Sequence, residues 1–408
     1  IGSFLDSLDV HPAAINIGVF IGHGSIRSAI VGEENIPVTS EQLTQMTSMV
    51  EAAMKDGAFG LSSGLEYTPG AFANVSELVE LSRPVAAKNG LYISHIRDEG
   101  GRLLESVGEV LEVGRSAGAR VQVTHHKLIG KSRWGGASAS LALLDEAIAE
   151  GVDAASDQYP YTASSTGLTI LFPTWSKDGG FEALVDRLND PTIRKQIRAE
   201  VIQHINAERG GDPATIVAAR CEFDSSFNGK SLADILTERG LPITVPGAAD
   251  VAIELVSAGS CSGVFHSMSP DDVETIMLHS KTSISSDGGI PAMNEGVPHP
   301  RSYGAFARVL AYYVREKGVM TLELAVYKMT SLPASQLNLE DRGKIAVGYV
   351  ADLTVFDPET IQDQALFGDP HHYATGVRDV WVSGIPVLKN AVMSGTHPGK
   401  ALRHHSQQ

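Results

Sequence analysis

Short apolar runs rich in β-forming residues alternate with longer amphipathic runs along most of this chain. Such alternation is typical of parallel βα units. The runs predicted to be strands in the first part of the chain are 14–20, 57–63, 91–96, 121–126 and 152–157. A helix is predicted over 40–55, where Thr39 and Ser40 precede an amphipathic stretch. We therefore expect an α/β protein built around a TIM-like (β/α) barrel.

Two departures from this rhythm suggest further units. The stretch from about 170 to 250 is helix-rich and charged, which predicts an insertion in the barrel. The alternation is expected to resume with strands at 262–268 and 282–288. After Gly343 the sequence changes to alternating strands with glycine turns. The predicted organisation is a barrel at 1–342, with the insertion, and a small β domain at 343–408.

The net charge and the hydropathy of the chain argue against nucleic-acid binding and against a membrane-spanning helix. The chain has 48 acidic and 32 basic residues and a net charge of −16, so it is not expected to bind nucleic acid. No stretch approaches the roughly 18 to 20 uninterrupted apolar residues of a membrane helix. The expected partner is a small molecule, and the oligomeric state stays open.

The cysteines suggest a cellular compartment for the protein, and the first residues suggest where its natural chain begins. Cys221 and Cys261 are too few for a disulfide framework, which predicts two reduced thiols in a cytoplasmic protein. The chain opens with IGSFLDSLDV, which has neither methionine nor the features of a signal peptide. We therefore expect that Ile1 is not the natural start.

Three predicted strands end in residue types that bind metals. His95 ends one run, His125 ends the next, and Asp287 ends the run at 282–288. The two histidines lie 30 residues apart, about one βα unit, which predicts adjacent strands. Imidazoles suit zinc, and a carboxylate can complete the site or act as its base. A single histidine at a strand end is more often a core residue, but three such ends together favour a metal site.

Groups that bind anions lie near these strand ends. Lys127 is two positions after His125 and shares its face if the strand continues, whereas His126 points away and is interpreted as structural. Tyr67 lies in a glycine- and proline-containing turn, and Arg301 follows the Asp287 strand. Each alone is more often a surface group. As a set they favour a substrate that carries a carboxylate.

Several long motifs resemble those of the D-aminoacylase, or N-acyl-D-amino-acid deacylase, family of the amidohydrolase superfamily. They run in the family's order and are GAFGLSSGLEYTPG, YISHIRDEG, VQVTHHK, SDQYPYTASSTGL, SISSDGGIP, HPRSYGAFARVL and GKIAVGYVADLTVFDP. The resemblance implies an α/β fold, namely a distorted (β/α)8 barrel with a small β-sandwich. This chain would lack the first barrel strands.

The resemblance also implies an activity and its cofactor. His95 and His125 match two zinc-binding histidines, and Asp287 matches the general base that later acts as an acid. The reaction implied is zinc-dependent hydrolysis of the amide bond of N-acyl-D-amino acids, which yields a carboxylic acid and a D-amino acid.

Substrate binding is implied in the same way. Tyr67, Lys127 and Arg301 match residues that hold the substrate carboxylate, and Ser164 lies in a stretch that lines the pocket. The preferred amino-acid side chain stays open.

The chain departs from the family at one site. The family's first strand carries an H-x-H or H-x-D pair, and a nearby cysteine bridges to the metal, but this sequence contains neither motif at a corresponding place. Two alternatives stand beside the deacylase interpretation. One is ring opening of a cyclic amide, as in dihydroorotases and hydantoinases. The other is a non-catalytic fragment. The number of metal ions is not determined.

Overall fold

Six parallel strands form the largest sheet of the computed structural model, which describes residues 1–404. Each strand pairs in parallel with its neighbour in the order β1-β2-β3-β4-β5-β9. The strands are β1 (Ile21–Gly22), β2 (Gly60–Gly64), β3 (Leu91–His95), β4 (Arg120–Val123), β5 (Ala154–Gln158) and β9 (Thr282–Ile284). Parallel pairing brings the carboxyl ends of all six strands to one edge of the sheet.

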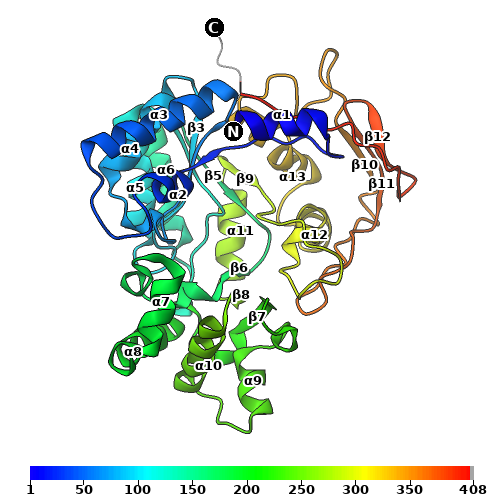
Figure 1. The fold of residues 1–408 in the computed structure, drawn as a ribbon. Coiled ribbons are helices and arrows are strands. Elements are labelled where there is room, and N and C mark those ends of the chain that lie inside the picture. Colours follow the sequence, from blue (N-terminus) through cyan, green and yellow to red (C-terminus); the bar gives the residue numbers. More distant parts are fainter. Residues whose placement is uncertain (405–408) are drawn as a thin grey trace.

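Amphipathic helices connect successive strands and cover the sheet (Figure 1). They are α2 (His23–Ile30), α3 (Ser40–Asp56), α4 (Val75–Ala86), α5 (Leu103–Ala117) and α6 (Ala137–Ala149). Their apolar faces bury Leu78 and Val107 against Leu61 and Tyr92 of the sheet. The predicted helix start is confirmed, because Thr39 and Gln42 form a reciprocal capping box at the beginning of α3.

A second group of helices packs beside β9. It comprises α11 (Pro270–Leu278), α12 (Arg301–Arg308), the π-helix η7 (Val309–Glu316), α13 (Leu322–Met329) and α14 (Ser331–Gln336). Val273, Leu310 and Ala325 form a core there with Tyr159 and Ile284 of the sheet side. Within residues 1–404, no helix combines the length and the apolar character needed to cross a bilayer.

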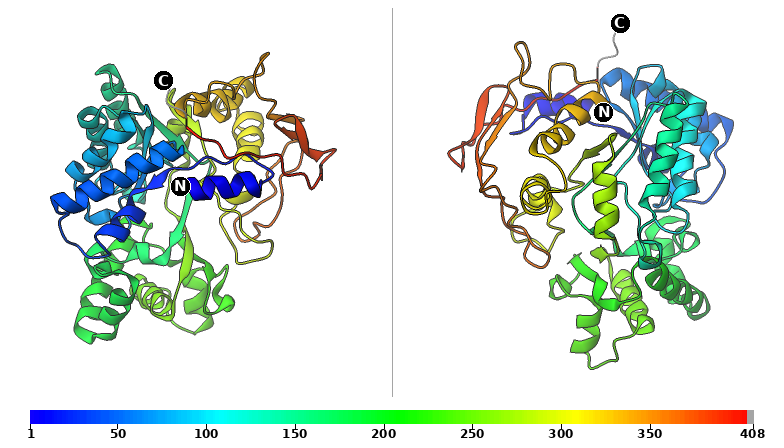
Figure 2. Two further views of the ribbon diagram at one scale, coloured as in Figure 1. Left: turned by 45° about the horizontal axis from the view of Figure 1, so that its top comes forward. Right: turned by 180° about the vertical axis from the view of Figure 1, so that it is seen from behind.

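The insertion forms its own antiparallel sheet and core. Its elements are β6 (Ala163–Gly167), α7 (Gly180–Asn189), α8 (Pro191–Glu208), β7 (Ile216–Cys221), α9 (Leu232–Glu238), α10 (Val245–Ala258) and β8 (Cys261–His266). Leu184, Val201 and Ile253 belong to a buried cluster of this unit. It lies at the carboxyl ends of the parallel strands in both Figure 1 and Figure 2.

The expected return to the barrel at 262–268 is wrong. This run is β8, the middle strand of the antiparallel sheet β6-β8-β7. Apolar runs of this length fit either kind of sheet, and the partners of β8 lie far away in the sequence. The parallel sheet continues instead with β9, which pairs directly with β5.

Two cysteines that were expected to be reduced form a disulfide. Cys221 ends β7 and lies opposite Cys261, the first residue of β8, and their sulfurs are bonded. The prediction of free thiols is therefore wrong, because only the β7–β8 pairing brings the two residues together. The disulfide also removes the argument from free thiols for a cytoplasmic protein.

The C-terminal part forms a four-stranded antiparallel sheet. Its strands are β10 (Leu353–Phe356), β11 (Val377–Val382), β12 (Ile385–Lys389) and β13 (Val392–Met393). The N-terminal helix α1 (Gly2–Val10) is not a part of this sheet. The two ends of the chain meet, because Ile17 pairs with the backbone of Lys400 and Leu402. The strand expected at 14–20 is thus reduced to a bridge at Ile17, and β1 begins at Ile21. The division into units 1–342 and 343–408 stays a prediction.

The disulfide can be checked chemically. Digestion of the unreduced, alkylated protein is expected to release one peptide pair that joins Cys221 to Cys261, since the two residues face each other in register. Mass spectrometry before and after reduction identifies the pair. Alkylation of both cysteines in the folded, unreduced protein would contradict the pairing.

Candidate metal and substrate site

The carboxyl ends of three parallel strands open into one cavity of about 270 Å³. His95 is the last residue of β3, His125 follows β4, and Asp287 follows β9. All three line the cavity, together with residues of the insertion strand β6. The structure therefore brings together the strand-end residues that the sequence analysis singled out.

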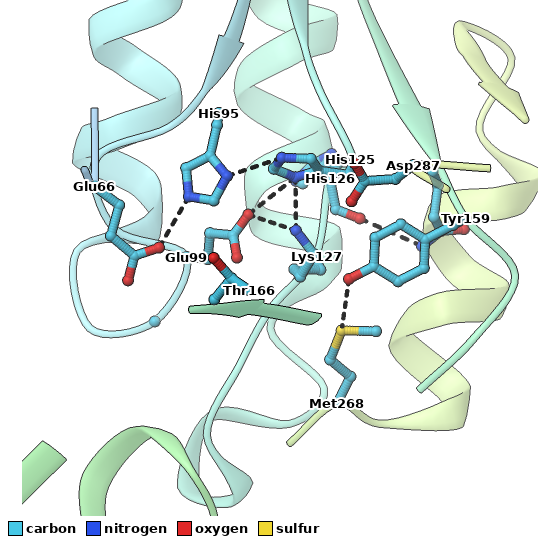
Figure 3. Close-up of polar contacts among 12 residues, drawn as sticks. Glu66, His95, Glu99, His125, His126, Lys127, Tyr159, Thr166, Met268 and Asp287 are labelled. Atoms are coloured by element: carbon cyan, nitrogen blue, oxygen red, sulfur yellow. Dashed lines mark hydrogen bonds and ion pairs between the residues drawn. The ribbon is translucent and has the colours of Figure 1, made fainter. Parts of the chain in front are cut away.

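The two histidines face each other through their inner ring nitrogens (Figure 3). His95 Nδ1 and His125 Nε2 lie 2.9 Å apart. Each outer nitrogen meets a carboxylate: His95 Nε2 lies 2.9 Å from Glu66 Oε2, and His125 Nδ1 lies 3.1 Å from Glu99 Oε1. Carboxylates beside the ring nitrogens are typical of metal-binding histidines, because they orient the rings. The contact between His95 Nδ1 and His125 Nε2 is a hydrogen bond in this structure, so one of the two nitrogens carries a proton, which a bound metal would displace.

Lys127 and Glu99 form a buried ion pair behind His125. Lys127 Nζ donates to Glu99 Oε1 at 2.5 Å and lies 2.6 Å from His125 Nδ1. Burial alone would raise the pKa of Glu99, but the charge of Lys127 and the two histidines hold it well below its usual value. Burial and Lys127 lower the pKa of His125. A neutral imidazole beside an ionised carboxylate is the state that a metal ligand requires.

Glu99 also lies close enough to His95 and His125 to belong to a ligand group, since one ligand atom from each residue lies within 4.8 Å of the others. Its contact with the outer nitrogen of His125 and its pairing with Lys127 nevertheless favour an orienting role. The inward-facing nitrogens of the two histidines, rather than this carboxylate, form the centre of the site.

The backbone at His125 is held in an unusual conformation. Its φ of +37° lies in the left-handed region, which non-glycine residues seldom adopt. Asp157 Oδ1 accepts hydrogen bonds from the His125 backbone N–H at 2.9 Å and from Ser285 Oγ at 2.7 Å. One carboxylate thus joins the ends of β4, β5 and β9. His126 turns away and contacts Ser140 Oγ at 2.9 Å, as a structural residue would.

Asp287 and Arg301 form an ion pair at the mouth of the cavity. Arg301 Nη1 lies 2.6 Å from Asp287 Oδ2, and the Asp287 side chain is 37% exposed. Arg301 also donates to the Ser165 carbonyl and stacks on the ring of Tyr159. His299 positions Arg301 by accepting a hydrogen bond from its backbone N–H at 3.0 Å.

Tyr67 and Ser164 complete the set that the sequence analysis singled out. Both line the cavity, and the Tyr67 ring lies 4.7 Å from the ring of His95. Thr166 Oγ1 donates to Tyr67 Oη at 3.0 Å. Burial and the neighbouring Glu66 carboxylate raise the pKa of Tyr67, so its hydroxyl stays protonated and can donate to an anion.

Sequence reasoning missed several residues of this cavity. They are Asp157, which binds the backbone N–H of His125, and the lining residues Glu66, Glu99, Tyr159, Thr166 and Arg209. The first four lie in or just after parallel strands, so the rule that chemistry gathers at strand ends could have found them. Thr166 and Arg209 come from the insertion, where no pattern in the sequence signals a role.

Comparisons with known proteins define the class of this fold and site. Residues 271–388 match the amidohydrolase family. A solved structure of N-acyl-D-glutamate deacylase from Bordetella bronchiseptica, complexed with zinc and a phosphonate inhibitor, superposes with a TM-score of 0.82 at 32% sequence identity. The match covers 99% of this chain and 75% of that one. The fold is therefore of the amidohydrolase type, as expected.

Two curated relatives specify the family. The chain is 34% identical over 399 residues to a D-aminoacylase from Alcaligenes xylosoxydans xylosoxydans. It is 35% identical over 400 residues to an N-acyl-D-glutamate deacylase from the same organism. Each match covers 98% of this chain and 72% of the relative. The chain belongs to the D-aminoacylase family of amidohydrolase enzymes, which confirms the resemblance seen in its motifs.

The contacts of His299 predict a pH-dependent stability. Its Nε2 donates to the Ala163 carbonyl and its Nδ1 accepts from Arg301, which fixes the neutral ring. Burial, then the charge of Arg301, hold the pKa of His299 well below its usual value. The unfolded chain binds a proton on this residue near pH 6.5, so the stability that His299 contributes is present above about pH 6.5 and is lost as the pH falls below it.

Urea unfolding at about pH 7.5 and about pH 5 measures this loss. His299→Gln is expected to lose less stability between the two values than the parent protein. The exposed residue His11 supplies the matched control, and His11→Gln is expected to behave like the parent. An equal loss in the parent and in His299→Gln would contradict the assignment.

Proposed function

We propose that this chain binds zinc through His95 and His125 and hydrolyses the amide bond of N-acyl-D-amino acids. The products are a carboxylic acid and a D-amino acid. One observation carries the proposal: a single cavity joins two inward-facing imidazole nitrogens, the Asp287 carboxylate and a set of anion-binding side chains. The names of the family relatives support this reaction, and the Bordetella deacylase complex supports the metal.

The chain's own residues fit a zinc ion. His95 Nδ1 and His125 Nε2 would hold it, and nitrogen ligands suit zinc. When bound, zinc polarises the amide carbonyl and lowers the pKa of water. Glu66 contacts the outer nitrogen of His95 and Glu99 contacts that of His125, which orients each ring.

Asp287 is proposed as the general base and then the general acid. Its carboxylate takes a proton from the attacking water and returns it to the leaving amine nitrogen. In the free protein Asp287 Oδ2 is paired with Arg301. A substrate carboxylate that binds Arg301 would compete with this pair and leave Asp287 available for the proton transfer.

The substrate carboxylate is proposed to lie among Arg301, Lys127 and Tyr67, with Ser164 beside them. Two cations and a phenolic hydroxyl can grip a carboxylate from several sides. An open-chain N-acyl amino acid offers that group next to the scissile amide. This fit favours the deacylase reaction over ring opening of a simple cyclic amide.

Metal binding can be measured without turnover. After chelation and titration with zinc, elemental analysis of the purified chain is expected to find about one zinc per chain. The double variant His95→Ala/His125→Ala is expected to hold none. Glu99→Gln is expected to bind zinc about 10- to 100-fold more weakly, because it loses the carboxylate that orients His125.

The matched control for this measurement is Glu112→Gln, on the exposed face of α5. It is expected to bind zinc like the parent. Zinc retained by the double alanine variant would overturn the assignment of the two histidines. Unchanged affinity in Glu99→Gln would remove its orienting role.

The reaction itself is tested with zinc-loaded protein and a panel of substrates. Acetate release is expected from N-acetyl-D-amino acids and not from their L-enantiomers, and no ring opening is expected with hydantoin or dihydrouracil. Asp287→Asn is expected to reduce kcat by about 100-fold or more with the zinc content unchanged. Asparagine also tolerates the φ of +47° at this position, so the variant keeps the backbone. Hydrolysis of the cyclic amides alone would falsify the proposal, and full activity of Asp287→Asn would exclude it as the base.

A further inference from the structure

A buried arginine of the insertion faces the cavity without a close partner. Arg209 follows α8, is 3% exposed and lines the same cavity as His95. Among residues 1–404, its Nε finds no hydrogen-bond partner. Its guanidinium lies 5.0 Å over the ring of Phe265, and its ion pair with Glu66 Oε1 spans 3.7 Å, which is too long for a hydrogen bond.

The other two cations of the cavity are paired more closely. Lys127 lies 2.5 Å from Glu99, and Arg301 lies 2.6 Å from Asp287. The carboxylate near Arg209 is shared, because Glu66 Oε2 is occupied by His95 Nε2 at 2.9 Å. Glu208, the preceding residue, also interacts with the charge of Arg209, but neither carboxylate accepts a hydrogen bond from its guanidinium among residues 1–404. A buried guanidinium without a hydrogen-bonded counter-charge is costly. A ligand carboxylate would satisfy it, since the planar fork of arginine binds both carboxylate oxygens.

Arg209 is placed to meet the side chain of an amino-acid substrate. It adjoins Glu66, which contacts His95, one of the two histidines at the reacting centre. Arg301 and Lys127 line the same cavity beside Asp287 and His125. The proposed function assigns the α-carboxylate to that second group of cations, so Arg209 is left for a group that the amino-acid side chain carries.

We infer that Arg209 binds a second carboxylate, so that this chain prefers N-acyl derivatives of acidic D-amino acids. The inference rests on the proposed function and specifies its substrate class. Arg209 would be a specificity-determining residue that the insertion supplies to the site.

Other side chains fit this position less well. An aliphatic side chain would leave the guanidinium buried without a hydrogen-bonded counter-charge, and a cationic one would be repelled. A carboxamide offers one neutral acceptor oxygen in place of two charged ones. Repulsion by Glu66 is moderated, since its carboxylate accepts from His95 and interacts with the buried Lys177. Three carboxylates and three cations line the cavity in all, so its charge does not exclude a dianion.

The test compares kcat/KM for zinc-loaded protein on N-acetyl-D-glutamate, N-acetyl-D-glutamine, N-acetyl-D-leucine and N-acetyl-D-lysine. The parent is expected to prefer the glutamate derivative over the glutamine derivative by about 10-fold or more, because a site built for a charged group discriminates against its neutral isostere. In Arg209→Gln this preference is expected to fall to within about 2-fold. Arg209→Lys, which keeps the charge, is expected to retain part of it.

A control variant and the use of an activity ratio distinguish a loss of specificity from a loss of folded protein. Arg198→Gln alters a half-exposed arginine of the same helix that pairs with Asp250, and it is expected to keep the full preference. Because the preference is a ratio of two substrates in one preparation, a fraction of inactive protein cancels from it.

The outcomes separate the two proposals. Hydrolysis of the whole series with no preference for the glutamate derivative overturns this inference alone, as does an unchanged preference in Arg209→Gln. Higher activity on the glutamine derivative also overturns it and indicates a carboxamide site. Failure to hydrolyse any N-acetyl-D-amino acid overturns the proposed function and this inference with it.

Discussion

The parallel pairing of β3 with β4 and of β5 with β9 is the constraint on which the site depends. Because Ser94 lies opposite Val123, the residues that follow, His95 and His125, emerge together at the same edge of the sheet. The β5–β9 pairing brings Asp287 to that edge although the whole insertion separates the two strands in the sequence. Asp157 reinforces the arrangement through hydrogen bonds to residues after β4 and β9.

Charge pairing is the second organising feature of the cavity. Buried ions are tolerated when they are paired, and Lys127 and Arg301 lie close to the carboxylates of Glu99 and Asp287. Glu99 illustrates the double use: it neutralises Lys127 and holds the outer nitrogen of His125. The cavity is therefore organised before a substrate binds, which reduces the reorganisation that catalysis requires.

The insertion contributes part of the cavity from a separately packed unit. Its core is a cluster distinct from the one beneath the parallel sheet. Through Ser164, Thr166 and Arg209 it adds polar groups around residues that the parallel strands position. Under the proposed function, the strand ends would supply the reacting groups and the insertion would contribute to the choice of substrate.

Local sequence patterns predicted the fold class, three residues of the site and the family of this protein. The βα rhythm and the rule that chemistry gathers at strand ends identified His95, His125 and Asp287, and long motifs identified the family. These features depend on residues near one another in the sequence or on a general property of parallel sheets. The roles of these residues stay predictions until they are measured.

Only the tertiary structure decided the rest. The antiparallel partners of β8, the bond between Cys221 and Cys261, and the approach of Glu66 and Arg209 to the histidines all join residues distant in the sequence. An apolar run does not specify which strand it will pair with. A charged residue does not show whether it will lie in water or against a cavity. Both are settled by long-range packing, in which the free energy of burial selects among partners that local sequence leaves equivalent.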